Sequence, residues 1–168
     1  MSPIEGTFNL IDHDGHPVTE QTYRGRWLMV FFGFTHCGIV CPRALSRLST
    51  VLAEIGDERA DRIQPLYITV DPERDTPPVM NQFLESNYPR FTGLTGTTEQ
   101  IEKAKDAFNV FARRKVDPAA ADCYVVPHTA ITYLLDPAGR YRTHWTDARD
   151  VDEIVVSLNA QIDAYRPA

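Results

Sequence analysis

Hydrophobic and polar positions change their spacing several times along this chain, and each change predicts an element of structure. Residues 27–32 form an unbroken apolar block that ends at Gly33. The block is too short to span a bilayer, and its Val, Phe and Trp content favours a strand covered on both faces. Beyond the glycine, apolar residues recur at helical spacing from Ala44 to Ile55, and Pro42 suits the first turn of that helix. We therefore expect a buried strand that leads through a short turn into a helix.

The rest of the chain predicts further strands and helices around this unit. Residues 8–19 alternate around an Asp-Gly turn, which is typical of a β-hairpin. A second hairpin is predicted by β-rich runs at 130–135 and 141–145 around an Asp-Pro-x-Gly turn. Three helices are predicted: one from Pro77 capped by Asp75 or Thr76, one capped by Thr97 or Thr98, and a last one capped by Asp150. A strand is predicted at 63–70, with its ladder complete only beyond Pro65, and a short strand or loop at 91–96. The segment 56–62 is predicted to be a charged loop, and the segment 113–122 a polar insertion or mobile loop.

The order of these elements predicts an α/β fold with a central mixed β-sheet flanked by helices and an N-terminal β-hairpin. This is a thioredoxin-like layout. The chain has 168 residues, of which 43% are hydrophobic, so it can bury one substantial core. We expect a single domain over residues 1–168, with residues 1–5 as a flexible tail.

Charge and composition exclude several classes of partner. The formal net charge of −6 argues against nucleic acid or an anionic membrane surface. The sequence has no apolar run of membrane-spanning length and no signal-like start, so we expect either a cytosolic protein or one whose leader has been removed. Three cysteines are too few for a disulfide scaffold.

Cys37 and Cys41 lie at the predicted turn between the buried strand and its helix. Such turns, at the carboxyl ends of strands, are where α/β folds place their sites, and the free amides of a helix start stabilise a thiolate. Four-residue spacing leaves the two Cα atoms near the upper limit for a disulfide, and it also lets both sulfurs converge on one soft metal ion. The alternative is a pair of buried, unreactive cysteines, which the position at a loop end disfavours.

His128 is the histidine best placed to join this pair. It precedes the strand expected beside the first core strand, so it can face the cysteine turn across the end of the sheet. Two thiolates and one imidazole suit Cu(I), or Zn(II) if a fourth ligand completes a tetrahedron. Cys123 is a candidate for that fourth ligand, although a partly buried loop thiol is the competing interpretation.

Two other groups of polar residues have less certain roles. Asp71 directly follows the strand at 63–70 and is not needed to cap the next helix, so it can lie beside the metal site and orient a ligand. His13 and His16 flank the Asp-Gly turn of the first hairpin. Two neighbouring histidines can bind metal, but the surrounding Asp, Gly and Pro favour a solvated turn.

Four segments together resemble the Sco/SenC family of copper chaperones. They are Phe34-Thr35-His36-Cys37-x-x-Val40-Cys41-Pro42, Val70-Asp71-Pro72-Glu73-Arg74-Asp75-Thr76-Pro77, Gly93-Leu94-Thr95-Gly96-Thr97, and Tyr124-Val125-Val126-x-His128-Thr129 with Tyr133-Leu134. The resemblance runs in order from about residue 8 to residue 139.

The resemblance implies a thioredoxin-like fold in which Cys37, Cys41 and His128 bind copper as Cu(I) or Cu(II). It implies delivery of copper to the copper A site of cytochrome c oxidase, or reduction of the thiols of that site. The expected partners are the oxidase subunit that carries copper A and other copper or thiol-redox proteins. The expected location is the periplasm or the outer face of an energy-transducing membrane, where the protein would be held by an anchor absent from this chain. We expect the domain to be a monomer.

This chain departs from the family pattern at Gly38 and Ile39, where members commonly have Pro and Asp, and at Pro127, where they have an acidic residue. Fewer nearby carboxylates change both the affinity for a cation and the pKa of the thiols. Three functions stay open: a copper chaperone, a thiol-disulfide oxidoreductase that cycles Cys37 and Cys41, and a redox or copper sensor. A chaperone with some reductase activity, rather than a dedicated enzyme, is the preferred interpretation, since His128 is unnecessary for disulfide exchange.

Overall fold

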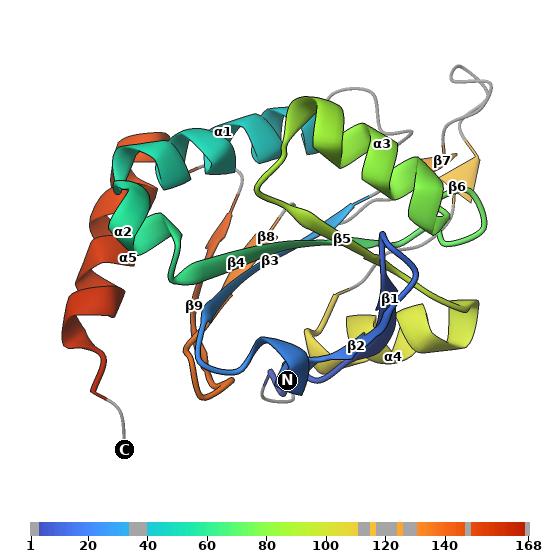
Figure 1. Ribbon diagram of the computed structural model, residues 1–168, viewed down its shortest axis with the longest axis horizontal. Coiled ribbons are helices and arrows are strands. Elements are labelled where there is room, and N and C mark those ends of the chain that lie inside the picture. Colours follow the sequence, from blue (N-terminus) through green and yellow to red (C-terminus); the bar gives the residue numbers. More distant parts are fainter. Residues whose placement is uncertain are drawn as a thin grey trace.

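The computed structural model describes residues 4–33, 40–110, 115–116, 124–125, 131–146 and 149–166. Within these residues a seven-stranded sheet has the order β2-β1-β5-β4-β3-β8-β9 (Figure 1). Strands β3, β4 and β5 are parallel, whereas β8 runs antiparallel to β3 and β1 runs antiparallel to β5. The predicted mixed sheet is thus confirmed. Its strands are β1 (Asn9–Asp12), β2 (Pro17–Thr19), β3 (Trp27–Gly33), β4 (Ile63–Thr69), β5 (Thr92–Thr95), β8 (Ile131–Leu135) and β9 (Tyr141–Thr146).

Helices cover both faces of the sheet, as Figure 1 shows with α1 and α3 above it and α4 below. One core cluster joins one face of the sheet to α1, α3 and α5. The other joins the opposite face to α4 and the N-terminal hairpin. The helices are η1 (Glu20–Tyr23), α1 (Val40–Glu54), α2 (Asp57–Ala60), α3 (Pro77–Asn87), α4 (Thr98–Ala107) and α5 (Val151–Ala164).

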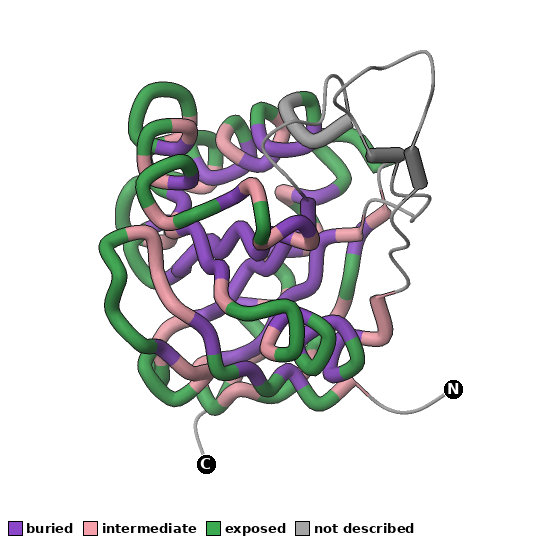
Figure 2. Tube along the Cα trace, turned by 90° about the vertical axis from the view of Figure 1, so that its right-hand side faces the viewer, coloured by how far each residue is buried: buried purple, intermediate pink, exposed green. Residues whose placement is uncertain are grey.

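Strand β3 is the centre of the core, and all of its residues are buried. Trp27, Met29 and Phe31 belong to the cluster beneath α1 and α5, whereas Leu28 and Phe32 belong to the cluster on the α4 side. Side chains of a strand alternate between faces, so a strand covered on both sides needs an unbroken apolar run. Figure 2 shows this buried centre beneath a largely exposed outer layer.

Helices α3, α4 and α5 all begin at a predicted N-cap residue, and two of these residues form a side-chain capping bond. The Thr97 hydroxyl accepts the Gln100 amide, and the Gln100 side chain accepts the Thr97 amide, which completes a capping box at α4. Asp150 accepts the Glu153 amide at the start of α5. At α3, Thr76 is the N-cap residue with Pro77 in the first turn, but no side-chain capping bond forms there.

Three local expectations need correction. The charged segment 56–62 contains the short helix α2, where Asp57 and Glu58 lie in the first turn, a place that favours acidic side chains. Pro65 delays only one side of its ladder, because β4 pairs with β3 from Ile63 but with β5 from Leu66. The segment 113–122 includes strand β6 (Lys115–Val116), which pairs with β7 (Tyr124–Val125), and its other residues lie outside those described.

The described N-terminal residues are held against the domain. The amides of Glu5 and Gly6 both donate to the Ala107 carbonyl, at 2.9 and 3.3 Å, and Ile4 packs against the core. The expectation of a flexible tail over residues 1–5 stays a prediction, and residues 1–3 lie outside the described residues. Among the helices that the structure describes, none has the length and apolar character needed to cross a membrane.

Candidate metal and thiol site

The ends of three chain segments meet at one edge of the sheet. Gly33, the last residue of β3, is level with Thr69, the last residue of β4, and the Val70 amide donates to the Gly33 carbonyl at 2.8 Å. On the other side of β3, Phe31 is level with Thr132, near the start of β8. The residues that follow β3 and β4 and those that precede β8 consequently enter or leave the sheet at the same edge.

The predicted ligands belong to these segments. Cys41 is the second residue of α1, the helix that follows β3. Cys37 and His128 lie outside the described residues, as does Cys123. Cys37 is four residues beyond Gly33 and His128 is three residues before the start of β8. The described strand ends that flank these residues in the sequence thus share one edge of the sheet, and the ligand set itself stays a prediction.

Packing fixes α1 over this edge. Ala44 and Leu48 line a small void together with Phe31 of β3 and Thr132 of β8. Ala44, Leu45 and Leu48 are all buried in the core cluster that contains Phe31. The helix start is therefore held near the strand ends by apolar contacts of its first turns.

The opposite face beneath the edge is aromatic. The ring of Phe32 packs edge-on against Phe108 of α4 at a centroid distance of 5.4 Å and against Tyr133 of β8 at 6.4 Å. Burial raises the pKa of Tyr133 to about 12, with a smaller contribution from Tyr141. Tyr133 consequently stays neutral at physiological pH and contributes no charge to the edge.

Asp71 lies two residues beyond β4, with only 2% of its surface exposed. Its amide donates to the Thr69 hydroxyl at 2.9 Å, and its carbonyl accepts the Asp75 amide at 3.0 Å. Its carboxylate accepts a charge-assisted hydrogen bond from Nε of Arg74. The carboxylate is thus at the predicted edge, but it is held in a buried ion pair.

Asp75 is also part of this network and is not a helix cap. It is fully buried, and its carboxylate accepts a hydrogen bond from the Thr69 hydroxyl at 2.7 Å. Neither this bond nor the ion pair of Asp71 with Arg74 was predicted from the sequence. The i,i+3 spacing of Asp71 and Arg74 was the available signal, yet an ordinary surface pair has the same spacing.

Comparison with known proteins identifies the family pattern over almost the whole chain. Residues 1–163 match the sequence model of the SCO1/SenC family. The mitochondrial SCO2 homolog of Mus musculus is 36% identical over 162 residues, which is 96% of this chain and 63% of the mouse protein. The yeast protein SCO2 of Saccharomyces cerevisiae is also 36% identical, and the match covers 98% of this chain but 54% of the yeast protein. This chain thus spans less than two thirds of the length of both relatives.

Two solved structures of the same fold contain copper. The crystal structure of Arabidopsis thaliana ScoI with copper bound has a TM-score of 0.89 and 31% identity, covering 96% of this chain and 99% of that one. The structure of Bradyrhizobium japonicum ScoI with copper bound has a TM-score of 0.82 and 36% identity, covering 94% and 98%. The thioredoxin-like fold expected from the order of elements is confirmed.

Proposed function

Because this chain belongs to the SCO1/SenC family, we propose that it is a copper metallochaperone that delivers copper to the copper A site of cytochrome c oxidase, or reduces the thiols of that site. The observation that supports the proposal is the strand register, which puts the end of β3 and the start of β8 at one edge of the sheet. In the sequence, Cys37 and Cys41 follow β3 and His128 precedes β8. The copper-bound ScoI structures of similar fold support copper as the cargo.

The reach of the chain supports a shared ligand set. A segment of four residues spans at most about 14 Å, and neighbouring strands lie about 4.8 Å apart. Cys37 follows β3 by four residues, and His128 precedes the adjacent strand by three. Both therefore have enough chain to meet Cys41, which enters α1 at the same edge.

The chemistry of the three side chains favours Cu(I). Two thiolates and an imidazole form a soft donor set of low coordination number. Thiolates are further favoured by the free amides at the start of α1 and by Arg43 and Arg47 in its first turns. Asp71, close to the same edge, adds negative charge that favours Cu(II) over Cu(I), although Arg74 offsets part of it.

Thiol-disulfide exchange is the second candidate function, and the four-residue spacing of Cys37 and Cys41 favours it. A disulfide and a bound Cu(I) use the same sulfur electrons, so reduction must precede metal binding. Both activities suit the periplasm or the outer face of an energy-transducing membrane, where thiols and disulfides interconvert and the oxidase receives its copper. We place the protein there.

Titration of Cu(I) into the fully reduced protein tests the proposal. We expect one equivalent to bind tightly. Cys37→Ser or Cys41→Ser should nearly abolish binding, and His128→Ala should weaken it while both thiols remain titratable. Two matched controls, Cys123→Ser and His144→Ala, should bind like the parent. Equal loss of binding in Cys123→Ser, or no loss in Cys41→Ser, would overturn the assignment.

A further inference from the structure

The turn between β1 and β2 gathers polar side chains that the copper site does not use. Asp12, the last residue of β1, is level with Leu94 of β5, which is level with Ile68 of β4 and then Phe32 of β3. Because β1 is antiparallel to β5, the turn continues away from the edge at which β3 ends. The turn is also separated from β3 by β5 and β4 in the strand order.

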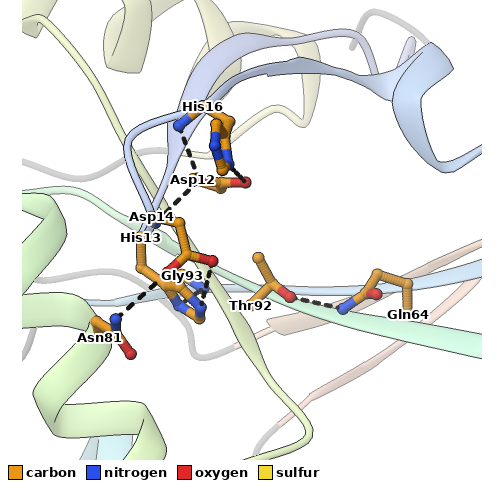
Figure 3. Close-up of polar contacts among 8 residues, drawn as sticks. All are labelled: Asp12, His13, Asp14, His16, Gln64, Asn81, Thr92 and Gly93. Atoms are coloured by element: carbon orange, nitrogen blue, oxygen red, sulfur yellow. Dashed lines mark hydrogen bonds and ion pairs between the residues drawn. The ribbon is translucent and has the colours of Figure 1, made fainter.

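Three potential metal ligands converge in this turn (Figure 3). One donor atom from each of Asp12, Asp14 and His16 lies within 4.8 Å of the others. Asp12 Oδ1 accepts the amides of Asp14 and His16, both at 2.9 Å, which leaves Oδ2 3.7 Å from His16 Nδ1. The backbone of the turn thereby aims the second carboxylate oxygen at the imidazole.

Contacts from other elements hold Asp14 in place. Asn81 of α3 donates to Asp14 Oδ1 at 3.4 Å, and His13 Nε2 lies 3.9 Å from Asp14 Oδ2. His13 Nδ1 accepts the Gly93 amide of β5 at 3.0 Å, so its ring proton belongs on Nε2, which faces Asp14. His13, with 18% of its side chain exposed, is therefore a brace between the turn and the sheet and not the solvated histidine that the sequence predicts.

The charges of the turn are unbalanced. Within the part of the chain that the structure describes, the ion pairs of Asp12 and Asp14 involve only histidines, and neither carboxylate contacts a lysine or arginine. Two neighbouring carboxylates repel each other, and a bound cation removes that repulsion. The imidazole of His16, 76% exposed, distinguishes the group from an ordinary acidic surface cluster.

We propose that Asp12, Asp14 and His16 form a second metal site, which takes a divalent transition metal such as Cu²⁺, Ni²⁺ or Zn²⁺. Imidazole favours these ions over Mg²⁺ and Ca²⁺, and carboxylates disfavour Cu(I). Bonds of about 2.0–2.2 Å place neighbouring ligand atoms about 3.0–3.5 Å apart. The Asp12–His16 pair at 3.7 Å therefore needs to close by only a few tenths of an ångström, whereas the three donor atoms together lie within 4.8 Å and Asp14 moves further. Water completes the coordination at this exposed turn.

Cu²⁺ is the probe of choice because it binds such donor sets most tightly and broadens nearby NMR signals. The full chain with Cys37→Ser, Cys41→Ser and Cys123→Ser contains no thiol, so the outcome does not depend on the proposed copper-chaperone function. Substoichiometric Cu²⁺ should selectively broaden the amide signals of residues 12–16 and of Gly93. Adding His16→Ala should weaken binding at the turn at least tenfold, and adding Asp14→Asn should also weaken it.

His144→Ala in the same background is the matched control and should leave Cu²⁺ affinity at the turn unchanged. His16 and Asp14 are exposed, and unchanged signal dispersion would verify that their variants fold. The proposal is overturned if Cu²⁺ broadens the segment before β8 or the N-terminus first. It is equally overturned if the turn binds Cu²⁺ with the same affinity after His16→Ala.

Discussion

At the scale of single residues, the carboxylate of Asp71 is the clearest case in which burial changes the meaning of a sequence position. No helix cap requires Asp71, so the sequence alone predicts that Asp71→Asn changes the free energy of unfolding by no more than about 1 kcal/mol, the range of ordinary surface changes. The buried pair with Arg74 changes that expectation, because the substitution leaves a guanidinium that is only 22% exposed facing a neutral amide.

We expect Asp71→Asn to lower the free energy of unfolding of the apo protein by about 1–3 kcal/mol, the scale for weakening a buried, charge-assisted hydrogen bond. Urea unfolding measures this, and Glu85→Gln, at an exposed position of α3, is the control. The folded variant should also lose Cu(II) more readily than Cu(I). Parent-like stability together with parent-like retention of both ions would show that Asp71 serves neither role.

Tyrosine ionisation provides a second test at this scale. Burial raises the pKa of Tyr133 and of Tyr23 to about 12, and Asp12 contributes at Tyr23. In the unfolded chain both phenols ionise near pH 10, so their contribution to stability is complete below pH 10 and is lost as the pH rises to about 12. Phenolate absorbance at high pH should show one fewer late-titrating tyrosine in Tyr133→Phe than in the parent. Ionisation of every tyrosine near pH 10 would contradict the burial seen here.

At the scale of elements, the capping box of α4 links a short sequence motif to the packing of one face of the sheet. Thr97→Ala removes the hydroxyl that accepts the Gln100 amide, so we expect a loss of about 1 kcal/mol in the free energy of unfolding. Thr98→Ala, one residue further into the helix, is the control and should have little effect. Equal losses in the two variants would indicate that the cap contributes nothing specific.

Elements were predictable where local pattern and tertiary environment agree. The apolar run of β3 requires cover on both faces, and α1 and α4 provide it. Helix α2 was not predictable, since its charged sequence has no apolar periodicity and its four residues owe their form to neighbouring contacts. The Asp71–Arg74 ion pair and the contact of His13 with Gly93 were not predicted. Both depend on which side chains the tertiary fold buries, and residue spacing alone does not give that information.

At the scale of the whole molecule, the sheet register decides which distant segments can act together. The edge shared by β3, β4 and β8 agrees with the expected grouping of two cysteines and a histidine, although Cys37 and His128 lie outside the described residues. The sequence could predict this grouping because each residue adjoins a strongly patterned strand, and the grouping itself stays a prediction. It could not identify the distances between the side chains.

The spacing of Cys37 and Cys41 predicts which thiols pair under oxidation. Mild oxidation of the apo protein should close a Cys37–Cys41 disulfide, leave Cys123 free and preserve the fold, because the four-residue spacing at a helix start is within bridging range. Peptide mapping by mass spectrometry after alkylation identifies the bridge. A disulfide that includes Cys123 would show that the third thiol lies closer to the pair than expected.

The most direct test of the central claim is X-ray absorption at the copper edge of the fully reduced protein loaded with one equivalent of Cu(I). We predict a three-coordinate ion with two sulfur neighbours and one imidazole nitrogen, and loss of the imidazole signal in His128→Ala but not in His144→Ala. A first coordination sphere of oxygen and nitrogen alone would contradict the assignment of Cys37, Cys41 and His128 as the copper ligands.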